Sequence, residues 1–186
     1  MSTYPITVAG CRRELPMCRL NDSLTIAGFV IMGDVELTCA CARDLLKIAA
    51  EYDYDYMVAP EAKAIPLIHE MARQSGCGEY IVVRKKKKAY MQGVFEASDS
   101  SITTEGDQKL FLDGADAQKI HGKRVLIIDD VISTGGSLAA VENLIRQAGA
   151  EIACKMAILA EGAAKDRTDI RFLQPLPLFD GEGRPL

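Results

Sequence analysis

The chain has 186 residues, of which 48% are hydrophobic, and carries a formal net charge of −4 with a sequence pI near 5.3. This length can bury one α/β core with a small attached subdomain but not two independent domains, so we expect a single domain over residues 1–186. The acidic balance argues against a general nucleic-acid binder, because such proteins carry a basic face that neutralises phosphates.

Targeting and metal-binding patterns are not evident in the sequence. Residues 1–5 lack the charged and apolar regions of a signal peptide, and no apolar run approaches the ~20 residues that span a bilayer. The six cysteines form no C-x-x-C pair and the two histidines lie far from any cysteine cluster, which indicates neither a zinc site nor a disulfide framework. We therefore expect a cytoplasmic protein without a membrane partner.

Strands and helices are predicted to alternate along the middle of the chain. Short apolar runs bounded by turn residues predict strands at residues 56–59, 80–83, 125–128 and 152–159, and amphipathic runs predict helices at residues 67–74 and 138–148. This order is typical of an α/β fold with a mostly parallel central sheet flanked by helices. We expect a core at residues 36–172 and a small hood formed by residues 1–35 and 173–186.

Charged residues follow the first two predicted strands. Residues 60–66 come after the first strand, and five consecutive cations, Arg84 to Lys88, come after the second. A charge run is usually a solvated face or a targeting signal. Because the carboxyl ends of parallel strands meet at one ligand-binding edge, this run is placed where it can neutralise the negative charge of a ligand.

A long polar segment separates this basic run from the next strand. It spans residues 89–123 and is punctuated by glycines. Connections of more than ~15 residues in a compact domain are usually lids or hairpins. We interpret residues 89–112 as a flexible flap over the site, with a strand at residues 109–112.

Residues 125–137 join a buried strand to an acid pair and a turn of small residues. Asp129 and Asp130 can accept hydrogen bonds from vicinal hydroxyls. The turn can hold a phosphate, because glycines let the backbone approach closely and the helix N-terminus favours negative charge. Each half also occurs alone in other folds, but together they describe a ribose 5-phosphate site. The turn residues are Ser133, Thr134, Gly135, Gly136 and Ser137.

The same thirteen residues resemble the phosphoribosyl pyrophosphate (PRPP) signature of type I phosphoribosyltransferases. The resemblance implies that Asp129 and Asp130 bind the ribose hydroxyls and that Ser133 to Ser137 hold the 5-phosphate. Residues 82–88 are similar to the Arg-Lys segment of adenine and xanthine phosphoribosyltransferases, and residues 60–66 resemble their pyrophosphate-binding loop. By this resemblance the pyrophosphate contacts are Glu61, Ala62, Lys63, Arg84, Lys85 and Lys88, and the Glu61–Ala62 peptide bond is cis.

Two further roles are implied by the resemblance to adenine enzymes. Glu105 occupies the position of a flap glutamate that handles the purine proton, whereas without the resemblance a solvated turn residue would be the better interpretation. Residues 28–34 fall where adenine enzymes carry a hood segment beside the base, although the arginine of that segment is absent here. Val30 and Ile31 are therefore the base-binding candidates.

The function implied by the resemblance is transfer of ribose 5-phosphate from PRPP to a purine, adenine before xanthine, with release of pyrophosphate. Mg²⁺ is the expected cofactor, held mainly by substrate oxygens with no protein ligand firmly assigned, and a homodimer is the expected assembly. Orotate-type chemistry is an alternative, since residues 64–67 also resemble that subgroup. Another is a PRPP-sensing regulator, but such regulators carry a DNA-binding domain for which we expect too little sequence ahead of the hood.

Overall fold

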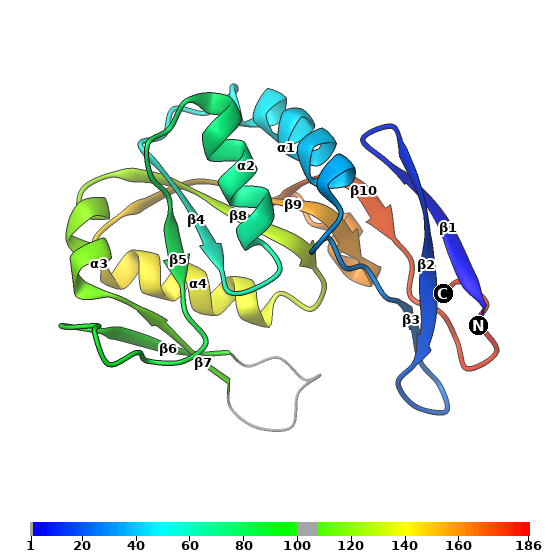
Figure 1. Ribbon diagram of the computed structural model, residues 1–186. Helices are drawn as coiled ribbons and strands as arrows, with labels where there is room; N and C mark the ends of the chain where they lie inside the picture. The colour runs from blue at the N-terminus through cyan, green and yellow to red at the C-terminus, as the bar shows by residue number, and fades with distance from the viewer. Residues whose placement is uncertain (1, 100–107) are drawn as a thin grey trace.

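The computed structural model describes residues 2–99 and 108–186, and its centre is a five-stranded parallel sheet in the order β10-β9-β8-β4-β5 (Figure 1). This confirms the predicted α/β fold with a parallel central sheet. The strands are β4 (Tyr56–Pro60), β5 (Ile81–Val83), β8 (Arg124–Ile132), β9 (Glu151–Glu161) and β10 (Arg171–Leu176). β8 continues four residues beyond the predicted strand, so Asp129 and Asp130 lie within the strand, near its carboxyl end.

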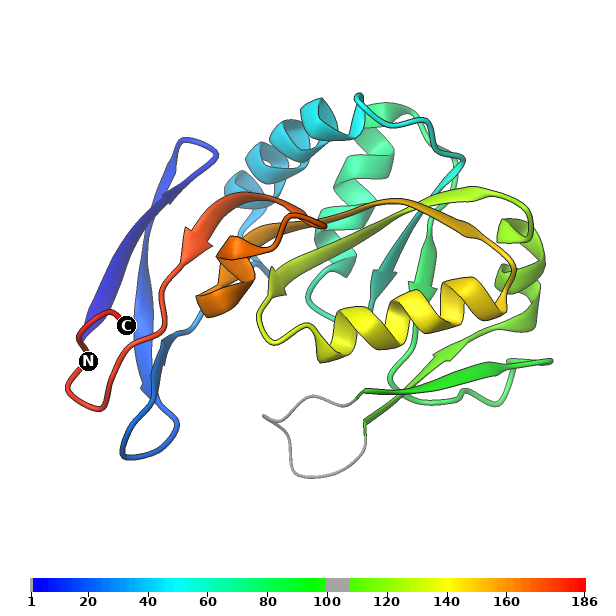
Figure 2. The ribbon, with the colours of Figure 1, turned by 180° about the vertical axis from the view of Figure 1, so that it is seen from behind.

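Helices cover both faces of the sheet (Figures 1 and 2). They are α1 (Val35–Ala49) and α2 (Ile65–Ser75) on one face, and α3 (Gly114–Ile120) and α4 (Gly136–Gln147) on the other. Leu126 and Ile128 of β8 belong to the first apolar core and Val125 and Ile127 to the second, which explains why this strand is apolar without interruption. Within the two described stretches, no helix is long and apolar enough to cross a membrane.

The two ends of the chain meet in the hood. β1 (Thr3–Val8), β2 (Cys11–Arg19) and β3 (Thr25–Ala27) form an antiparallel sheet, and the C-terminal segment pairs with it through Thr25 and Phe179. The hood was expected to resume at residue 173, but β10 extends the central sheet to residue 176. Pro175 interrupts the apolar pattern of this strand, and it is tolerated because β10 is an edge strand that can lack one N–H.

A bidentate ion pair fastens the hood to the core. Arg13 of β2 donates from Nε to Asp34 Oδ2 (2.6 Å) and from Nη2 to Asp34 Oδ1 (3.0 Å), and it also reaches Glu36 (2.7 Å). Asp34 is the N-cap of α1 and accepts from the Leu37 N–H. The Arg13 guanidinium accordingly holds the pKa of Asp34 below its usual value. Arg13 thus supplies, from another strand, a guanidinium beside the hood segment that lacks its own arginine.

The described part of the predicted flap is a hairpin of β6 (Phe95–Asp99) and β7 (Gln108–Leu112). Its base is tied to the end of β5, because Arg84 and Phe111 exchange two backbone hydrogen bonds of 2.8 Å each. The hairpin and the basic segment therefore share one attachment point.

We expect Glu70→Gln to lower the free energy of unfolding by about 1 kcal/mol at pH 7. Glu70 on α2 is 8% exposed and accepts from Arg73 Nη2 (2.7 Å) and Gln74 Nε2 (2.8 Å). These donors lower the pKa of Glu70 from 4.5 to about 2. A pKa lowered by folding adds stability above the unfolded value and loses it as the pH falls through the folded one.

Urea unfolding at several pH values checks this. The difference between wild type and Glu70→Gln should shrink as the pH falls from 4.5 toward 2, the two pKa values of Glu70. Because Arg73 is mostly exposed, solvent screening keeps the effect well below the full shift. The exposed Glu51→Gln is the control, and a difference that stays constant with pH would contradict the assignment.

Candidate active site

The parallel strands bring the predicted site residues to one edge of the sheet. The loop after β4 carries Lys63, whose Nζ lies 3.9 Å from Asp130 Oδ2 on β8. Glu61 of the same loop contacts Arg84 after β5, with 3.3 Å between Oε2 and Nε. Three segments separated widely in sequence thus meet at their carboxyl ends, where open α/β sheets bind ligands.

The acid pair contains a buried oxygen that lacks a hydrogen-bond donor. Asp129 is half-buried and its Oδ1 accepts from the Asp130 N–H (2.8 Å). Asp130 is 7% exposed, and among the described residues its Oδ2 has no hydrogen-bond partner. The 3.9 Å to Lys63 is too long for a hydrogen bond. Since an unsatisfied buried acceptor is costly, this oxygen is suited to a donor from a ligand.

The two carboxylates also influence each other's charge. Burial, and then the neighbouring charge of Asp130, raise the pKa of Asp129 well above its usual value, while the Asp130 N–H and Lys63 act in the opposite direction. Asp129 therefore takes up a proton at a higher pH than an isolated aspartate would. A ligand that donates hydroxyls, or that brings a cation, would favour the fully ionised pair.

The turn between β8 and α4 is shaped for an anion. Gly135 is the N-cap of α4 with φ +86°, and within the described residues this helix end has no side-chain cap hydrogen bond. The N–H groups of the first turn are therefore free to bind a negatively charged group. A Cβ on Gly135 would lie 2.5 Å from Arg167 Nη1. The positive φ favours glycine here, and an added Cβ would require the Arg167 guanidinium to shift.

The loop after β4 positions the basic segment. The Glu61–Ala62 peptide bond is cis, which confirms the prediction. The Glu61 carboxylate accepts from the Lys85 N–H (3.0 Å), and this bond, followed by the charges of Arg84 and Lys88, lowers the pKa of Glu61. Its side chain is thus directed at the basic segment, and any pyrophosphate contact of Glu61 is left to its peptide group.

The basic segment is only partly exposed. Arg84 and Lys88 are half-buried, whereas Lys85 is exposed. The Nε of Arg84 is buried and has no hydrogen-bond partner in the described part of the chain. Its charge is nevertheless paired, because Glu61 Oε2 lies 3.3 Å from this nitrogen.

The two base-binding candidates in the hood differ in burial. Val30 is 55% exposed, whereas Ile31 is fully buried in the core cluster that also contains Phe29. The Ile31 side chain is committed to the core, and only its peptide groups are available to a base. The predicted proton acceptor, Glu105, lies outside the described residues.

Two residues near this edge were missed by sequence reasoning. Glu161 ends β9, and burial raises its pKa, with the Ser133 hydroxyl and Lys63 acting in the opposite direction. Its position directly after an apolar strand was a signal that could have identified it. Arg167, beside Gly135, carries no such signal, because its contact with the turn depends on how the chain returns after β9.

These features define a class of protein. A parallel α/β sheet presents two acidic acceptors, an uncapped helix N-terminus and several cations at one edge, which is the arrangement that a ribose 5-phosphate ligand requires. The family model of the phosphoribosyl transferase domain matches residues 38–174. The chain belongs to this family.

Similar proteins agree with the family. A hypoxanthine/guanine phosphoribosyltransferase from a Methanocaldococcus species is 33% identical over 147 residues, which cover 76% of this chain and 71% of the relative. An adenine phosphoribosyltransferase from Thermotoga petrophila is 34% identical over 117 residues, covering 63% of this chain and 65% of the relative. The structure of an adenine phosphoribosyltransferase from Rhodothermus marinus has the same fold, with a TM-score of 0.66, 22% identity and 94% of each chain covered.

We expect Gly135→Ala to destabilise the protein by about 1 kcal/mol more than Gly76→Ala, and to weaken binding of ribose 5-phosphate. Gly76 has φ +76° and a Cβ there would meet no atom within 4 Å, so Gly76→Ala measures the backbone cost alone. At Gly135 the Cβ also meets a guanidinium that Asp169 holds in place. Thermal or urea unfolding gives the two costs, and equal costs would show that Arg167 does not constrain the turn.

Proposed function

We propose that the chain is a purine phosphoribosyltransferase, which transfers ribose 5-phosphate from PRPP to a purine base and releases pyrophosphate. The observation that carries this proposal is the Oδ2 of buried Asp130, which lacks a hydrogen-bond donor among the described residues, lies 3.9 Å from Lys63 and precedes the turn before α4 in sequence. A sugar hydroxyl supplies the missing donor, and a 5-phosphate on the same sugar reaches the turn. The basic segment remains for the diphosphate.

The proposed reaction separates charge in two directions. The bond from the anomeric carbon to the pyrophosphate oxygen breaks as a purine nitrogen forms its bond to that carbon, and positive charge develops on the sugar. Asp129 and Asp130 stabilise this charge from the sugar side. Lys63, Arg84, Lys85 and Lys88 take up the negative charge that grows on the leaving group.

A proton acceptor completes the reaction. Bond formation at a purine nitrogen releases a proton, and a carboxylate shielded from water can take it. We retain Glu105 for this role on the strength of its position in the sequence. Glu105→Gln should lower the rate of transfer more than it lowers PRPP affinity, and an equal fall in both would assign Glu105 a structural role.

The acid pair could supply only one or two of the ligands that Mg²⁺ needs. Within the described residues no three His, Cys, Asp or Glu side chains converge into a metal-binding group. Mg²⁺ dehydrates reluctantly and commonly uses one or two carboxylates with substrate oxygens and water. Asp129 and Asp130 would supply those carboxylates, and the bound ion would neutralise part of the diphosphate charge.

Adenine is our first candidate for the base, and the Thermotoga petrophila relative supports it. A 6-oxopurine, hypoxanthine or guanine, is the second candidate and is supported by the Methanocaldococcus relative; xanthine follows. The test is to incubate the chain with PRPP, Mg²⁺ and each purine and to measure pyrophosphate and nucleotide. Tight PRPP binding without nucleotide formation from any base would contradict transfer and support a PRPP-sensing role.

We further propose a homodimer. Large apolar side chains are exposed where the hood segment enters α1, with Val30 at 55%, Met32 at 50% and Val35 at 72%. An exposed apolar group of this kind favours association over solvation. Light scattering at micromolar concentration tests this, and a monomeric mass would contradict it.

We expect the double variant Asp129→Asn, Asp130→Asn to lose transfer activity by at least ~100-fold and to bind PRPP more weakly. The amides keep the side-chain volumes but remove the charges that stabilise the sugar. The free energy of unfolding should be equal or higher, because the repulsion within the pair disappears. Steady-state kinetics with the exposed Asp53→Asn as control checks this, and undiminished activity would show that the acid pair is not the sugar site.

A further inference from the structure

A guanidinium lies against the proposed phosphate turn without belonging to it. Arg167 follows the short helix η1 (Gly162–Asp166) that ends β9. Its Nη1 is the closest atom to the position that a Cβ would take on Gly135, at 2.5 Å. The side chain is 30% exposed, so its charge is only partly screened by water.

Two of the three guanidinium nitrogens are already committed. Arg167 Nε donates to Asp169 Oδ1 (2.9 Å) and Nη2 donates to Asp169 Oδ2 (2.7 Å), which is the bidentate geometry of a strong pair. Nη1, which carries two further N–H donors, makes no hydrogen bond to any described residue. The uncommitted nitrogen is the one that faces the turn.

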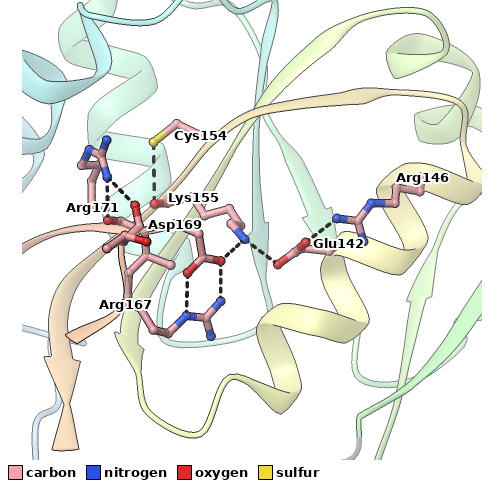
Figure 3. Close-up of polar contacts among 9 residues, drawn as sticks. Glu142, Arg146, Cys154, Lys155, Arg167, Asp169 and Arg171 are labelled. Atoms are coloured by element: carbon pink, nitrogen blue, oxygen red, sulfur yellow. Dashed lines mark hydrogen bonds and ion pairs between the residues drawn. The ribbon is translucent and has the colours of Figure 1, made fainter. Parts of the chain in front are cut away.

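The Arg167–Asp169 pair is in turn held by Lys155 and Glu142 (Figure 3). Lys155 of β9, whose side chain is 13% exposed, donates to Asp169 and also to Glu142 Oε1 of α4 (3.0 Å). Glu142 accepts in turn from Arg146 Nη2 (2.6 Å). Positive and negative side chains therefore alternate from Arg146 in the last turn of α4 to Arg167 beside Gly135. Three cations and two carboxylates give the network one net positive charge. The uncommitted nitrogen of the network, Arg167 Nη1, lies beside Gly135.

A network of this kind could serve stability alone. Buried ion pairs are weak evidence for stability, however, because the cost of removing charges from water often exceeds the attraction gained. Here Lys155 and Glu142 are nearly buried, and their effect is to fix Asp169, which fixes the plane of the Arg167 guanidinium. The network is thus better explained as a means of orienting Arg167 Nη1 toward the turn than as a source of stability.

We propose that Arg167 is a positioning residue for the 5-phosphate, oriented by Asp169 and Lys155 so that its uncommitted Nη1 faces the turn at residues 133–137. This inference rests on the proposed function of that turn. The guanidinium constrains Gly135 and adds a positive charge where the helix N-terminus supplies only partial charges. A phosphate dianion gains from both effects, whereas pyrophosphate bound at Lys63 and Arg84 does not.

The test measures binding of two probes, ribose 5-phosphate and inorganic pyrophosphate, by calorimetry on the intact chain. Arg167→Gln should weaken ribose 5-phosphate about tenfold and leave pyrophosphate within about twofold, because only the first ligand uses the turn. Arg167→Lys should recover part of the loss, since it restores charge without the fork. Arg146→Gln removes a pair from the far end of the same network and should change neither affinity.

The outcomes separate this inference from the function on which it rests. If wild type binds ribose 5-phosphate and Arg167→Gln binds it equally well, the role of Arg167 is overturned and the proposed function stands. If both probes weaken equally, Arg167 is structural and the inference is also overturned. If wild type binds neither ribose 5-phosphate nor PRPP, the proposed function fails and the inference with it. Should Arg167→Gln not fold, the ratio of the two affinities in Arg167→Lys decides in the same way.

Discussion

The rest of the site depends on one unsatisfied interaction, the buried carboxylate of Asp130. Its Oδ2 has no donor in the described part of the chain, and Lys63 stops at 3.9 Å. Beside it, burial and like charge raise the pKa of Asp129. A buried acceptor without a donor is costly, so a ligand or an ion that completes the pair would be favoured. The surrounding cations and the anion-binding turn fit a ligand that is hydroxylated in the middle and phosphorylated at both ends.

Charged side chains on two loops, on α4 and after β9 hold the groups that such a ligand needs. On one side, Glu61 accepts from the Lys85 N–H and approaches Arg84, so the loop after β4 and the segment after β5 are held together. On the other side, Glu142 ties the body of α4 to Lys155, and Asp169 passes this constraint to Arg167 at the helix N-terminus. Several polar side chains at the edge are therefore positioned by other charged side chains.

Much of this arrangement could be predicted from local sequence. The uninterrupted apolar run of residues 125–128 indicated a strand with both faces covered, and the residues after it indicated the acid pair and the turn. The cis bond at Glu61–Ala62 was predicted from a family resemblance and is present. Other features depend on partners distant in sequence. The strand β10 was not predicted, because Gln174 and Pro175 interrupt its apolar pattern. It is stabilised by parallel pairing with β9.

Side-chain direction was the harder part to predict. Val30 and Ile31 are adjacent in sequence, yet one is exposed and the other is buried in the core. The contacts of Arg167 with Asp169 and Gly135 depend on the return of the chain after η1, which no periodicity encodes. Sequence reasoning therefore placed the charged groups at one edge of the sheet but predicted the orientation of individual side chains poorly.

The most direct measurement compares ribose 5-phosphate with 2-deoxyribose 5-phosphate in calorimetric titrations of the wild-type chain. Both sugars carry the phosphate that the turn is proposed to bind, and they differ only in one hydroxyl of the vicinal pair. If that hydroxyl satisfies a carboxylate of the acid pair, the deoxy sugar should bind about tenfold more weakly, since its loss leaves the acceptor buried and unpaired. Equal affinity for the two sugars would contradict the account.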